Sequence, residues 1–464
     1  MSEKIHIAVY GLGPASIFFL ENFINTDIQL HVFEYGKSFD QSLFKSIDQI
    51  NGPIKFFNNS NKERAKGFFG TASLWSTKGV GGKLLKFDEE DLIKNNWPIS
   101  YKDLNVCYQK IIENFDKNFN IRINEELNNN QLKNLINNKP ENFKIKKGSQ
   151  SLSYCFNEVI NYYKIKITNA KNIKIYYEHT LTNFDINKND NQIKAANVLN
   201  NKEMIKIIAD YHILSCGCLE SNRVMLETFK DNLSYINSKK IGKGLTFHPS
   251  FKLGTLKKEK KIKKKILKTY IDYKKEVFGI KISDKYQKAN SAAFLSFVEK
   301  SEKKLLPKLY DKFFGDIVRI DVSLAIEHLP SNDCSVNLSD NLDENLKSKI
   351  NIFSNFNDEN MQFAKQEYLK YVNFFKKAEI FGHTFFKDDF NLNLETNNHH
   401  HGGLNFGCES RHAVNQNLQF KDLKNLFINS SAVFPSSSIY NPTLTIIALA
   451  KRLSFFINER LKSN

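Results

Sequence analysis

Apolar residues at the start of the chain form one short run and one periodic stretch. Ile5 to Val9 is a nearly continuous apolar run of the length of a buried strand. Gly11 and Gly13 follow it, and Ile17 to Ile24 then repeats apolar residues at helical spacing. The pattern predicts a strand, a glycine-containing turn and a helix.

Later segments carry comparable patterns. Tyr211 to Ser215 predicts another buried strand, which passes through Cys216-Gly217-Cys218 into a helix. Apolar and polar residues alternate in Asp316 to Ile326 and in Lys349 to Phe353, which is typical of antiparallel strands. An apolar helix is expected from Thr443 to Ile457. The predicted fold class is therefore α/β (α+β overall), with strand–turn–helix units and an antiparallel sheet.

The glycine turn is the first feature with a chemical meaning. Gly11 permits a tight turn, and Gly13 lets the backbone approach a pyrophosphate closely. The helix that begins near Pro14 would direct its N–H groups and its positive dipole end at the same phosphates. Ser16 stands where a third glycine is usual, and it is still small enough for close helix packing. These residues predict a dinucleotide-binding site.

A carboxylate stands at the expected spacing beyond the turn. The apolar run Ile28 to Phe33 predicts the next strand, which ends in Glu34. An acid about 20 residues beyond the glycines accepts hydrogen bonds from a ribose diol and repels a 2′-phosphate, which disfavours NADP. This fingerprint accounts for the adenosine half of a dinucleotide and does not choose between NAD and FAD.

Composition limits the possible classes. The 464 residues contain 41% hydrophobic and 25% charged residues, which excludes fibrous, collagenous and wholly disordered chains. The length suggests two or three folding units, and the 20 glycines and 9 prolines leave little material for a long flexible hinge. We therefore expect domains that interleave.

The net charge of +17 raises the question of a nucleic-acid or membrane partner. Much of the excess lies in one run, Lys257 to Lys268, while Lys, Asn, Ile and Phe are frequent throughout the chain. We interpret the charge as solvated surface and expect no specific nucleic-acid partner.

Cysteine usage and hydropathy bear on location. The 6 cysteines form no CxxC pair and no disulfide-like framework, which fits a reducing compartment. The N-terminal sequence has no basic-then-apolar leader, and no segment approaches ~20 uninterrupted apolar residues. We expect a cytoplasmic protein without a membrane span.

Two blocks near the C-terminus carry a family resemblance. One is HHHGGLNFG, His399 to Gly407, and the other runs from LFINSSAVFP, Leu426 to Pro435, on to NPTLTI, Asn441 to Ile446. Together with the glycine turn they resemble the glucose-methanol-choline (GMC) family of FAD-dependent oxidoreductases. The motifs of that family read His-x-x-Gly-Thr-x-x-Met-Gly, LYVADASVFP and ANPTLTI.

Further segments resemble the same family in the same order. Gly70 to Trp75 is similar to its flavin loop, and Trp97 to Leu104 to its WPISYEDL stretch. His212 to Leu226 resembles its LAAGAIESPRLLL strand and helix, and Ile241 to Pro249 resembles the turn before its substrate domain. Ile326 to Asp343 resembles an outgoing strand with an asparagine-rich turn. The resemblance implies a Rossmann-like FAD-binding domain interleaved with a substrate domain, whose antiparallel sheet covers the flavin. The expected FAD-binding domain is 1–110, 150–250 and 395–464, with a helical or lid insertion at 111–149 and the substrate domain at 251–394.

Several residues depart from the family pattern. Gly403 and Phe406 occupy the Thr and Met positions of the histidine block, and Ser430 replaces an Asp in the closing segment. Family members with covalently held flavin carry a His in the flavin loop, where this chain has Leu74. The resemblance therefore implies non-covalent FAD, and it leaves open whether the changed positions mark altered or lost activity.

The resemblance also implies catalytic roles. Oxidation of an alcohol needs a base for the O–H proton and an acceptor for the hydride, which is N5 of the flavin. His399 takes the position of the family's base, with His400 and His401 as alternatives if the register slips. A neutral imidazole suits this role. Asn441 takes the second catalytic position, where its amide could bond the substrate oxygen.

Structural interpretations of the same residues stay open. Three adjacent histidines also fit a polar loop or, less well, a metal site, because consecutive residues cannot easily converge on one ion. Asn441 and Pro442 are a favoured N-cap and first helical residue, so they also fit the simple start of a helix. Cys216 and Cys218 fit a strand-to-helix turn near the adenine half of FAD better than a metal or redox pair.

Candidate cofactor-binding residues come from all of these segments, and no metal ligand is expected. We expect FAD to be bound by Gly11, Gly13, Pro14, Ala15, Ser16, Glu34, Gly70, Thr71, Ser73, Trp75, Leu181, Cys216, Gly217, Asn429, Ser430, Pro442 and Thr443.

The predicted function is FAD-dependent oxidation of a hydroxyl carbon in a sugar, polyol or cyclitol derivative. This substrate class rests on the likeness of the histidine block to sugar-oxidising relatives, and the electron acceptor is not predicted. Another FAD enzyme class, such as an amine oxidase or a flavin hydroxylase, would share the glycine turn without the His399 and Asn441 blocks. A non-catalytic flavin-fold protein that binds polyanions would instead account for the lysine run.

Overall fold

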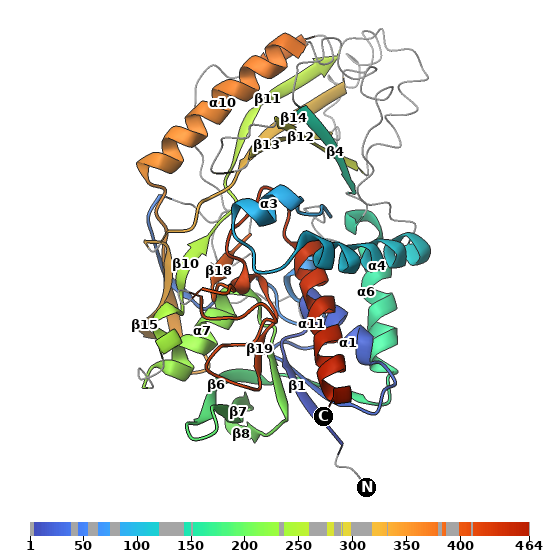
Figure 1. Cartoon of the computed structure of the whole chain (residues 1–464), viewed down its shortest axis with the longest axis vertical. Helices are drawn as coiled ribbons and strands as arrows, with labels where there is room; N and C mark the ends of the chain where they lie inside the picture. The colour runs from blue at the N-terminus through green and yellow to red at the C-terminus, as the bar shows by residue number, and fades with distance from the viewer. Residues whose placement is uncertain are drawn as a thin grey trace, which may run out of the picture.

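The strands form four sheets in the part of the chain that the computed structural model describes (Figure 1). The parallel sheet lies in the lower half of the view, and the largest antiparallel sheet lies at the top. The described residues are 4–38, 45–53, 64–74, 84–119, 143–149, 152–231, 236–258, 276–282, 289, 291–297, 318–331, 333–378, 383–386, 399–409 and 412–463.

The parallel sheet holds the N-terminal strand at its centre, in the order β19-β9-β1-β2-β5. Residues Ile7 to Tyr10 of β1 are completely buried, which explains their nearly continuous apolar sequence, because strands of a covered parallel sheet have no solvent face. The strands of this sheet are β1 (His6–Tyr10), β2 (Gln29–Glu34), β5 (Ile173–Tyr177), β9 (Tyr211–Leu214) and β19 (Leu426–Ile428).

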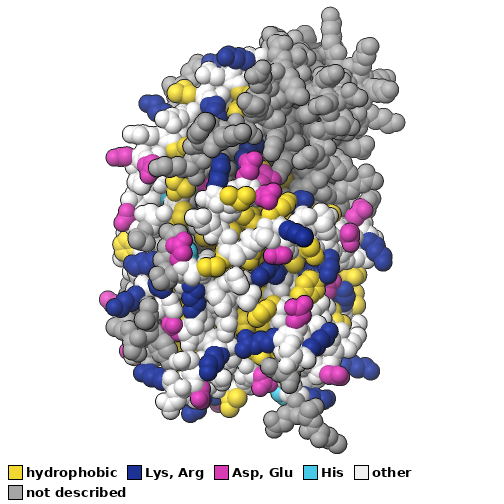
Figure 2. Space-filling view, in the orientation of Figure 1, with side chains coloured by type: hydrophobic (Ala, Val, Ile, Leu, Met, Phe, Trp, Pro, Cys, Tyr) yellow, Lys and Arg dark blue, Asp and Glu magenta, His cyan; other side chains and the backbone are white. Residues whose placement is uncertain are grey.

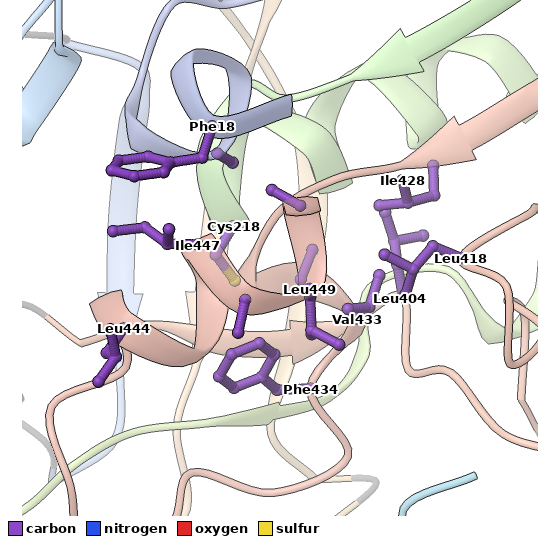
Figure 3. Close-up of a cluster of buried hydrophobic side chains, with 14 of the residues drawn as sticks. Phe18, Cys218, Leu404, Leu418, Ile428, Val433, Phe434, Leu444, Ile447 and Leu449 are labelled. Atoms are coloured by element: carbon purple, nitrogen blue, oxygen red, sulfur yellow. The ribbon is translucent and has the colours of Figure 1, made fainter. Parts of the chain in front are cut away.

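Helices from both ends of the chain pack together beside this sheet. The C-terminal helix α11 contacts α1 and α4, and Phe18 of α1 lies near Ile447 of α11 in the apolar cluster of Figure 3. Cys218 of α7 and Phe434 belong to the same cluster, so the core joins segments that are far apart in sequence. The helices are α1 (Pro14–Leu20), α3 (Glu89–Lys94), α4 (Tyr101–Phe119), α6 (Leu152–Thr168), α7 (Gly217–Phe229), α10 (Asp358–Ala378) and α11 (Thr443–Ser463), with 3₁₀ turns η1 (Glu21–Phe23), η3 (Gly70–Leu74), η4 (Ile236–Lys240) and η6 (Ser431–Val433).

The largest antiparallel sheet has the order β17-β11-β14-β13-β12-β4, and α10 runs alongside it in Figure 1. Of the predicted strand Asp316 to Ile326, the described residues, Val318–Ile326, form β14 in this sheet. The strands are β4 (Phe143–Ser149), β11 (Ser250–Lys258), β12 (Glu276–Ile282), β13 (Ser291–Phe297), β14 (Val318–Ile326) and β17 (His383–Phe386).

A third sheet is mixed and has the order β18-β10-β15-β16-β3. The run Lys349 to Phe353 lies here, in β16, and pairs with β15 and, in parallel, with β3. Its pairing with β15 is antiparallel, as the alternation predicts, but it lies in a different sheet from β14. The strands are β3 (Ile47–Asn51), β10 (Lys243–Thr246), β15 (Ser335–Leu342), β16 (Ser348–Phe353) and β18 (His401–Gly403); a small meander consists of β6 (Thr180–Asn187), β7 (Gln192–Asn200) and β8 (Glu203–Ile207).

The structure differs from the expected domain boundaries at two places in the described residues. Helix α4 runs through residue 110 without a break, and β4, from the expected insertion, is an edge strand of the antiparallel sheet. Residues 120–142 of that insertion lie outside the described residues. The predicted fold class is confirmed, since a parallel sheet and antiparallel sheets occur together. None of the helices in the described ranges is both long and apolar enough to cross a membrane.

Positive charge is dispersed on the face shown in Figure 2, where Lys and Arg side chains alternate with Asp and Glu. Most of the run Lys257 to Lys268 lies outside the described residues, so the interpretation of this run as solvated surface stays a prediction.

Candidate active site

The glycine turn connects β1 to α1 with the geometry that a nucleotide site needs. Gly11 has a φ of +91°, and a Cβ on it would lie 2.7 Å from the carbonyl oxygen of Ser215. A Cβ on Gly13 would meet no atom within 4 Å, so this residue borders open space. Ser16, at the third-glycine position, donates a hydrogen bond from Oγ to the Gly11 carbonyl at 2.6 Å. The serine therefore stabilises the turn from within.

Glu34 ends β2, and its buried carboxylate joins three loops. Oε2 accepts a hydrogen bond from the Leu12 amide at 2.9 Å, and Oε1 accepts from the Gly36 and Gly67 amides at 2.8 and 2.9 Å. Gly67 belongs to the segment that leads into the predicted flavin loop. The predicted ribose contact stays a proposal, whereas this anchoring role was not anticipated from the sequence.

The predicted flavin loop lies directly on the glycine turn. The Phe69 amide donates to the Leu12 carbonyl at 2.9 Å, and a Cβ on Gly70 would lie 3.5 Å from the Gly13 Cα. Thr71 is exposed, and its Oγ1 accepts from the Ala65 amide at 3.2 Å. Ser73 and Leu74 complete η3, and Trp75 lies outside the described residues.

The turn into α7 faces the same region from the other side of β1. The thiol of Cys216 donates to the Tyr10 carbonyl at 3.3 Å, and Gly217, with a φ of +75°, borders open space as Gly13 does. Burial raises the pKa of the Cys216 thiol to about 12 and also raises that of Cys218. Both cysteines are therefore thiols at neutral pH, which does not suit a metal or redox pair.

The closing segment ties α1 to the end of β9. The side-chain amide of Asn429 donates to the Ala15 carbonyl at 3.2 Å and to Ser215 Oγ at 3.0 Å. Ser430 caps η6 by accepting from the Ala432 amide at 3.3 Å. Pro442, directly before α11, accepts from the Ile446 amide at 2.9 Å through its carbonyl.

His399 and Asn441, which are 42 residues apart in sequence, meet in space. The amide nitrogen of Asn441 lies 3.3 Å from Nε2 of His399, and both residues are partly exposed. On the other side of the ring, Nδ1 of His399 lies 2.9 Å from Nδ1 of His248, which is buried. His399 is therefore held at both ring nitrogens beside an accessible surface.

The two neighbouring histidines are in a different environment. His400 is buried, and burial, followed by the nearby charge of Arg64, lowers its pKa to about 3. His401 lies in β18, is fully buried, and stacks on Phe434 with ring centroids 5.4 Å apart. Burial lowers its pKa well below the ordinary value as well. Both imidazoles are neutral and inaccessible, so the geometry favours His399 as the base.

Two departures from the family pattern have packing explanations. A Cβ on Gly403, which has a φ of +89°, would lie 2.2 Å from Oδ1 of Asn222, so the threonine of the family pattern has no room here. Phe406 is fully buried and meets Trp97 edge to face, with centroids 5.3 Å apart. At the base of the histidine block, Asn222 thus occupies the space beside Gly403, and Phe406 fills the space beside Trp97.

A buried cluster of charges supports the segment that carries Asn441. Glu327 is fully buried and accepts from Asn95 Nδ2 at 2.9 Å and from the Ser438 amide at 3.2 Å. Tyr440, next to Asn441, donates to Asp88 at 2.8 Å. No motif in the sequence indicates this arrangement, because its residues come from three separate segments.

Asp91, in the same cluster, makes the stability of the protein depend on pH. Burial raises the pKa of its carboxyl from 3.8 to about 7, although the ammonium of Lys281, 3.7 Å away, opposes the shift. The folded state therefore holds a proton that the unfolded chain releases, and this stabilisation, complete below about pH 4, is lost as the pH rises to 7.

We expect Asp91→Asn to remove that loss. The free energy of unfolding of Asp91→Asn minus that of the unmodified protein should be about 3 kcal/mol larger at pH 7.5 than at pH 5, because only the unmodified protein loses stability over this range. Urea unfolding of both proteins at the two pH values measures the difference. A difference that does not change with pH would show that Asp91 is ionised throughout.

Among the described residues, no group of three or more His, Cys, Asp or Glu side chains is placed to hold a metal ion. The five cysteines in the described ranges are free thiols. The open space beside Gly13 and Gly217, at the start of two helices and against the flavin loop, fits a dinucleotide such as FAD.

Comparisons with known proteins agree with this geometry. Residues 330–450, which contain both C-terminal blocks, match the family model described as GMC oxidoreductase. No curated protein sequence matches the chain. Among solved structures, pyridoxine 4-oxidase from Mesorbium loti is similar, with a TM-score of 0.58 and 12% identity over 98% of this chain and 99% of that one.

Formate oxidase is similar as well, with a TM-score of 0.56 and 13% identity over the full length of both chains. A structure described as concerning FAD modification in Aspergillus oryzae RIB40 formate oxidase gives a TM-score of 0.55, with 13% identity and the same coverage. The structural likeness confirms the fold. The family match confirms the resemblance and, at the level of the family, the prediction of an FAD-dependent oxidoreductase.

Proposed function

We propose that this chain, whose residues 330–450 match the GMC oxidoreductases, oxidises a hydroxyl group of a sugar, polyol or cyclitol derivative. His399 acts as the base, Asn441 binds the substrate oxygen, and FAD is held without a covalent bond. The observation that carries the proposal is the meeting of His399 and Asn441 at 3.3 Å beside an accessible surface.

His399 suits the role of base because of its surroundings. Its Nε2 lies by the Asn441 amide, and its Nδ1 is held by His248, so the ring cannot turn freely. A substrate hydroxyl that takes the place of the amide N–H at Nε2 would give its proton to Nε2, and the amide could then donate to the substrate oxygen. FAD, when bound, would accept the hydride from the same carbon.

Asn441 suits a different role. A side-chain amide cannot act as a base, but its N–H donates a hydrogen bond to an oxygen that gains negative charge as its proton leaves. Asn441 also stands two residues before α11, a helix of 21 residues whose N-terminal end favours negative charge nearby. These two residues thus divide proton removal and oxygen binding between them.

Two observations support the remaining parts of the proposal. His399 and Asn441, both partly exposed, offer a hydrogen-bond acceptor and a donor side by side, which suits a hydroxyl group of the substrate. Leu74, at the end of η3, has no atom that can bond to a flavin, which agrees with non-covalent FAD. The proposed FAD contacts are those named for the glycine turn, the flavin loop, the α7 turn and the closing segment.

The proposal is tested with the purified protein and a panel of sugars, polyols and cyclitols. We expect flavin absorption bands that remain in the supernatant after acid precipitation, because the cofactor is not covalently bound. Under anaerobic conditions, one substrate class should bleach the band near 450 nm, and admitting air then shows whether oxygen restores it. Glycine and a primary amine serve as controls for an amine oxidase.

Two outcomes would contradict the proposal. Absence of flavin after incubation with excess FAD would exclude an FAD enzyme. Bleaching by an amine, with no response to any alcohol, would assign the chain to a different flavin chemistry.

A further inference from the structure

His248 lies directly behind the candidate base, outside the two blocks that carry the catalytic prediction. It follows β10 and precedes β11, at the point where the chain passes into the antiparallel sheet. Its side chain is 3% exposed, and its ring is 5.1 Å from that of His399 between centroids. The two Nδ1 atoms are 2.9 Å apart, which is a hydrogen-bond distance.

A hydrogen bond between two Nδ1 atoms contains one proton, so one ring donates and the other accepts. Nε2 of His399 faces the amide nitrogen of Asn441, which can only donate. His399 must therefore have a bare Nε2 and a proton on Nδ1, which it donates to His248. His248 in turn must accept at Nδ1 and hold its own proton on Nε2.

We propose that His248 is a positioning residue for His399: it accepts the Nδ1–H bond, and so keeps Nε2 of His399 unprotonated and directed at the substrate. This inference rests on the proposed function of His399. In the reaction the substrate O–H bond breaks and its proton forms a bond to Nε2 of His399. No bond to His248 is made or broken, and its lone pair stabilises the resulting imidazolium.

None of the other groups named near His399 takes over the role of accepting its Nδ1–H bond. His401, from β18, has its ring centroid 6.5 Å from that of His399, and His400 follows His399 in the chain. Burial keeps the pKa of both low, so both are neutral at the pH of the reaction. Arg64 is the cation whose charge acts on His400, and Asn441 is uncharged. The proton released by the substrate therefore stays on the pair His399–His248.

Two substitutions at position 248 separate this role from simple packing. His248→Phe keeps the ring and removes the acceptor, whereas His248→Asn places an amide oxygen at the same number of bonds as Nδ1. We expect His248→Phe to lower kcat by roughly 10- to 100-fold, with KM and FAD content unchanged. The acid side of its pH profile should move to lower pH, because the imidazolium has lost its acceptor. His248→Asn should restore most of both.

A matched control uses another buried histidine. His212 in β9 is fully buried and bonds Tyr10 through Nδ1, far from His399 in the chain. His212→Phe should lower the melting temperature without moving the pH profile. Equal losses of kcat in His248→Phe and His248→Asn, with an unchanged pH profile in both, would overturn the proposal in favour of packing.

A second measurement does not need turnover, so it separates this inference from the proposed function. Imidazole ¹⁵N spectra of the histidine-labelled holoprotein, assigned with His399→Gln, report which nitrogen of His399 carries the proton. We expect Nδ1–H in the unmodified protein and in His248→Asn, and a change of tautomer in His248→Phe. A tautomer that is the same in all three proteins would overturn the inference, even if an alcohol substrate is found.

Discussion

Replacing His399 with alanine is expected to lower kcat by roughly 10²- to 10⁴-fold, the range by which a positioned general base accelerates proton transfer. The loss follows because Asn441 cannot take a proton, and because His400 and His401 are buried and inaccessible. FAD content should not change, since no cofactor contact is proposed for this side chain. Anaerobic reduction of the flavin, followed at 450 nm with the substrate that the panel identifies, measures the rate of the affected step.

His400 provides the control for whether the family motif has been aligned to the correct histidine. His400→Ala removes a buried ring, so it should lower the melting temperature through the cavity that it leaves. Its flavin reduction rate should stay within roughly tenfold of the unmodified protein, because its pKa of about 3 makes it a poor base at neutral pH. A larger loss in His400→Ala than in His399→Ala would move the base to position 400.

Partial restoration of His399→Ala by added imidazole would identify the missing function as proton transfer. The space left by the ring is partly exposed and has Asn441 and His248 on its two sides, so a free imidazole can occupy the same hydrogen bonds. Restoration should increase with pH, because only the neutral form of imidazole accepts a proton.

The start of the fold could be predicted because its information is local. The run that became β1, Gly11 with its positive φ, and the helix after Pro14 follow one another within 20 residues. Glu34 was found in the same way, from its spacing to the glycines. Its bonds to Leu12, Gly36 and Gly67 could not be predicted, since the last of these depends on how a distant loop folds back.

Strand partners were harder to predict because they depend on contacts between distant segments. Lys349 to Phe353 has a clear strand pattern, but nothing in it specifies β15 and β3 as neighbours. The strand β4 contains three lysines in seven residues and has no apolar run, so its pairing with β12 left no signal in the sequence. Alternation predicts that a strand exists, whereas its place in a sheet is set by the whole chain.

The candidate site shows the same limit. His399 and Asn441 were identified through motifs, and the structure brings them together. His248 was inside a stretch that resembled the family, IGKGLTFHP, yet a single histidine there gave no indication of a contact with position 399. Glu327 and Asp91 support the Asn441 segment from other elements, and such support leaves no pattern of spacing.

Gly13→Ala is expected to weaken FAD binding by roughly 10- to 100-fold while leaving the FAD-free protein as stable as before. The backbone at Gly13 has a φ of −77° and a ψ of −178°, which any residue adopts, and the new methyl group would meet no protein atom within 4 Å. The methyl group would therefore project into the space where the pyrophosphate of FAD is proposed to approach the turn. FAD titration of the apoprotein, followed by flavin fluorescence, measures the affinity.

Gly11→Ala is the matched comparison, because the same methyl group there meets the protein itself. It would lie 2.7 Å from the Ser215 carbonyl, on a residue with a φ of +91°, so the melting temperature of the FAD-free protein should fall. Gly11 is thus required by the protein fold, whereas Gly13 is required only by the bound FAD, although the two residues are only two positions apart. Unchanged FAD affinity in Gly13→Ala would show that the phosphates do not approach this turn, and the nucleotide site would then have to lie elsewhere.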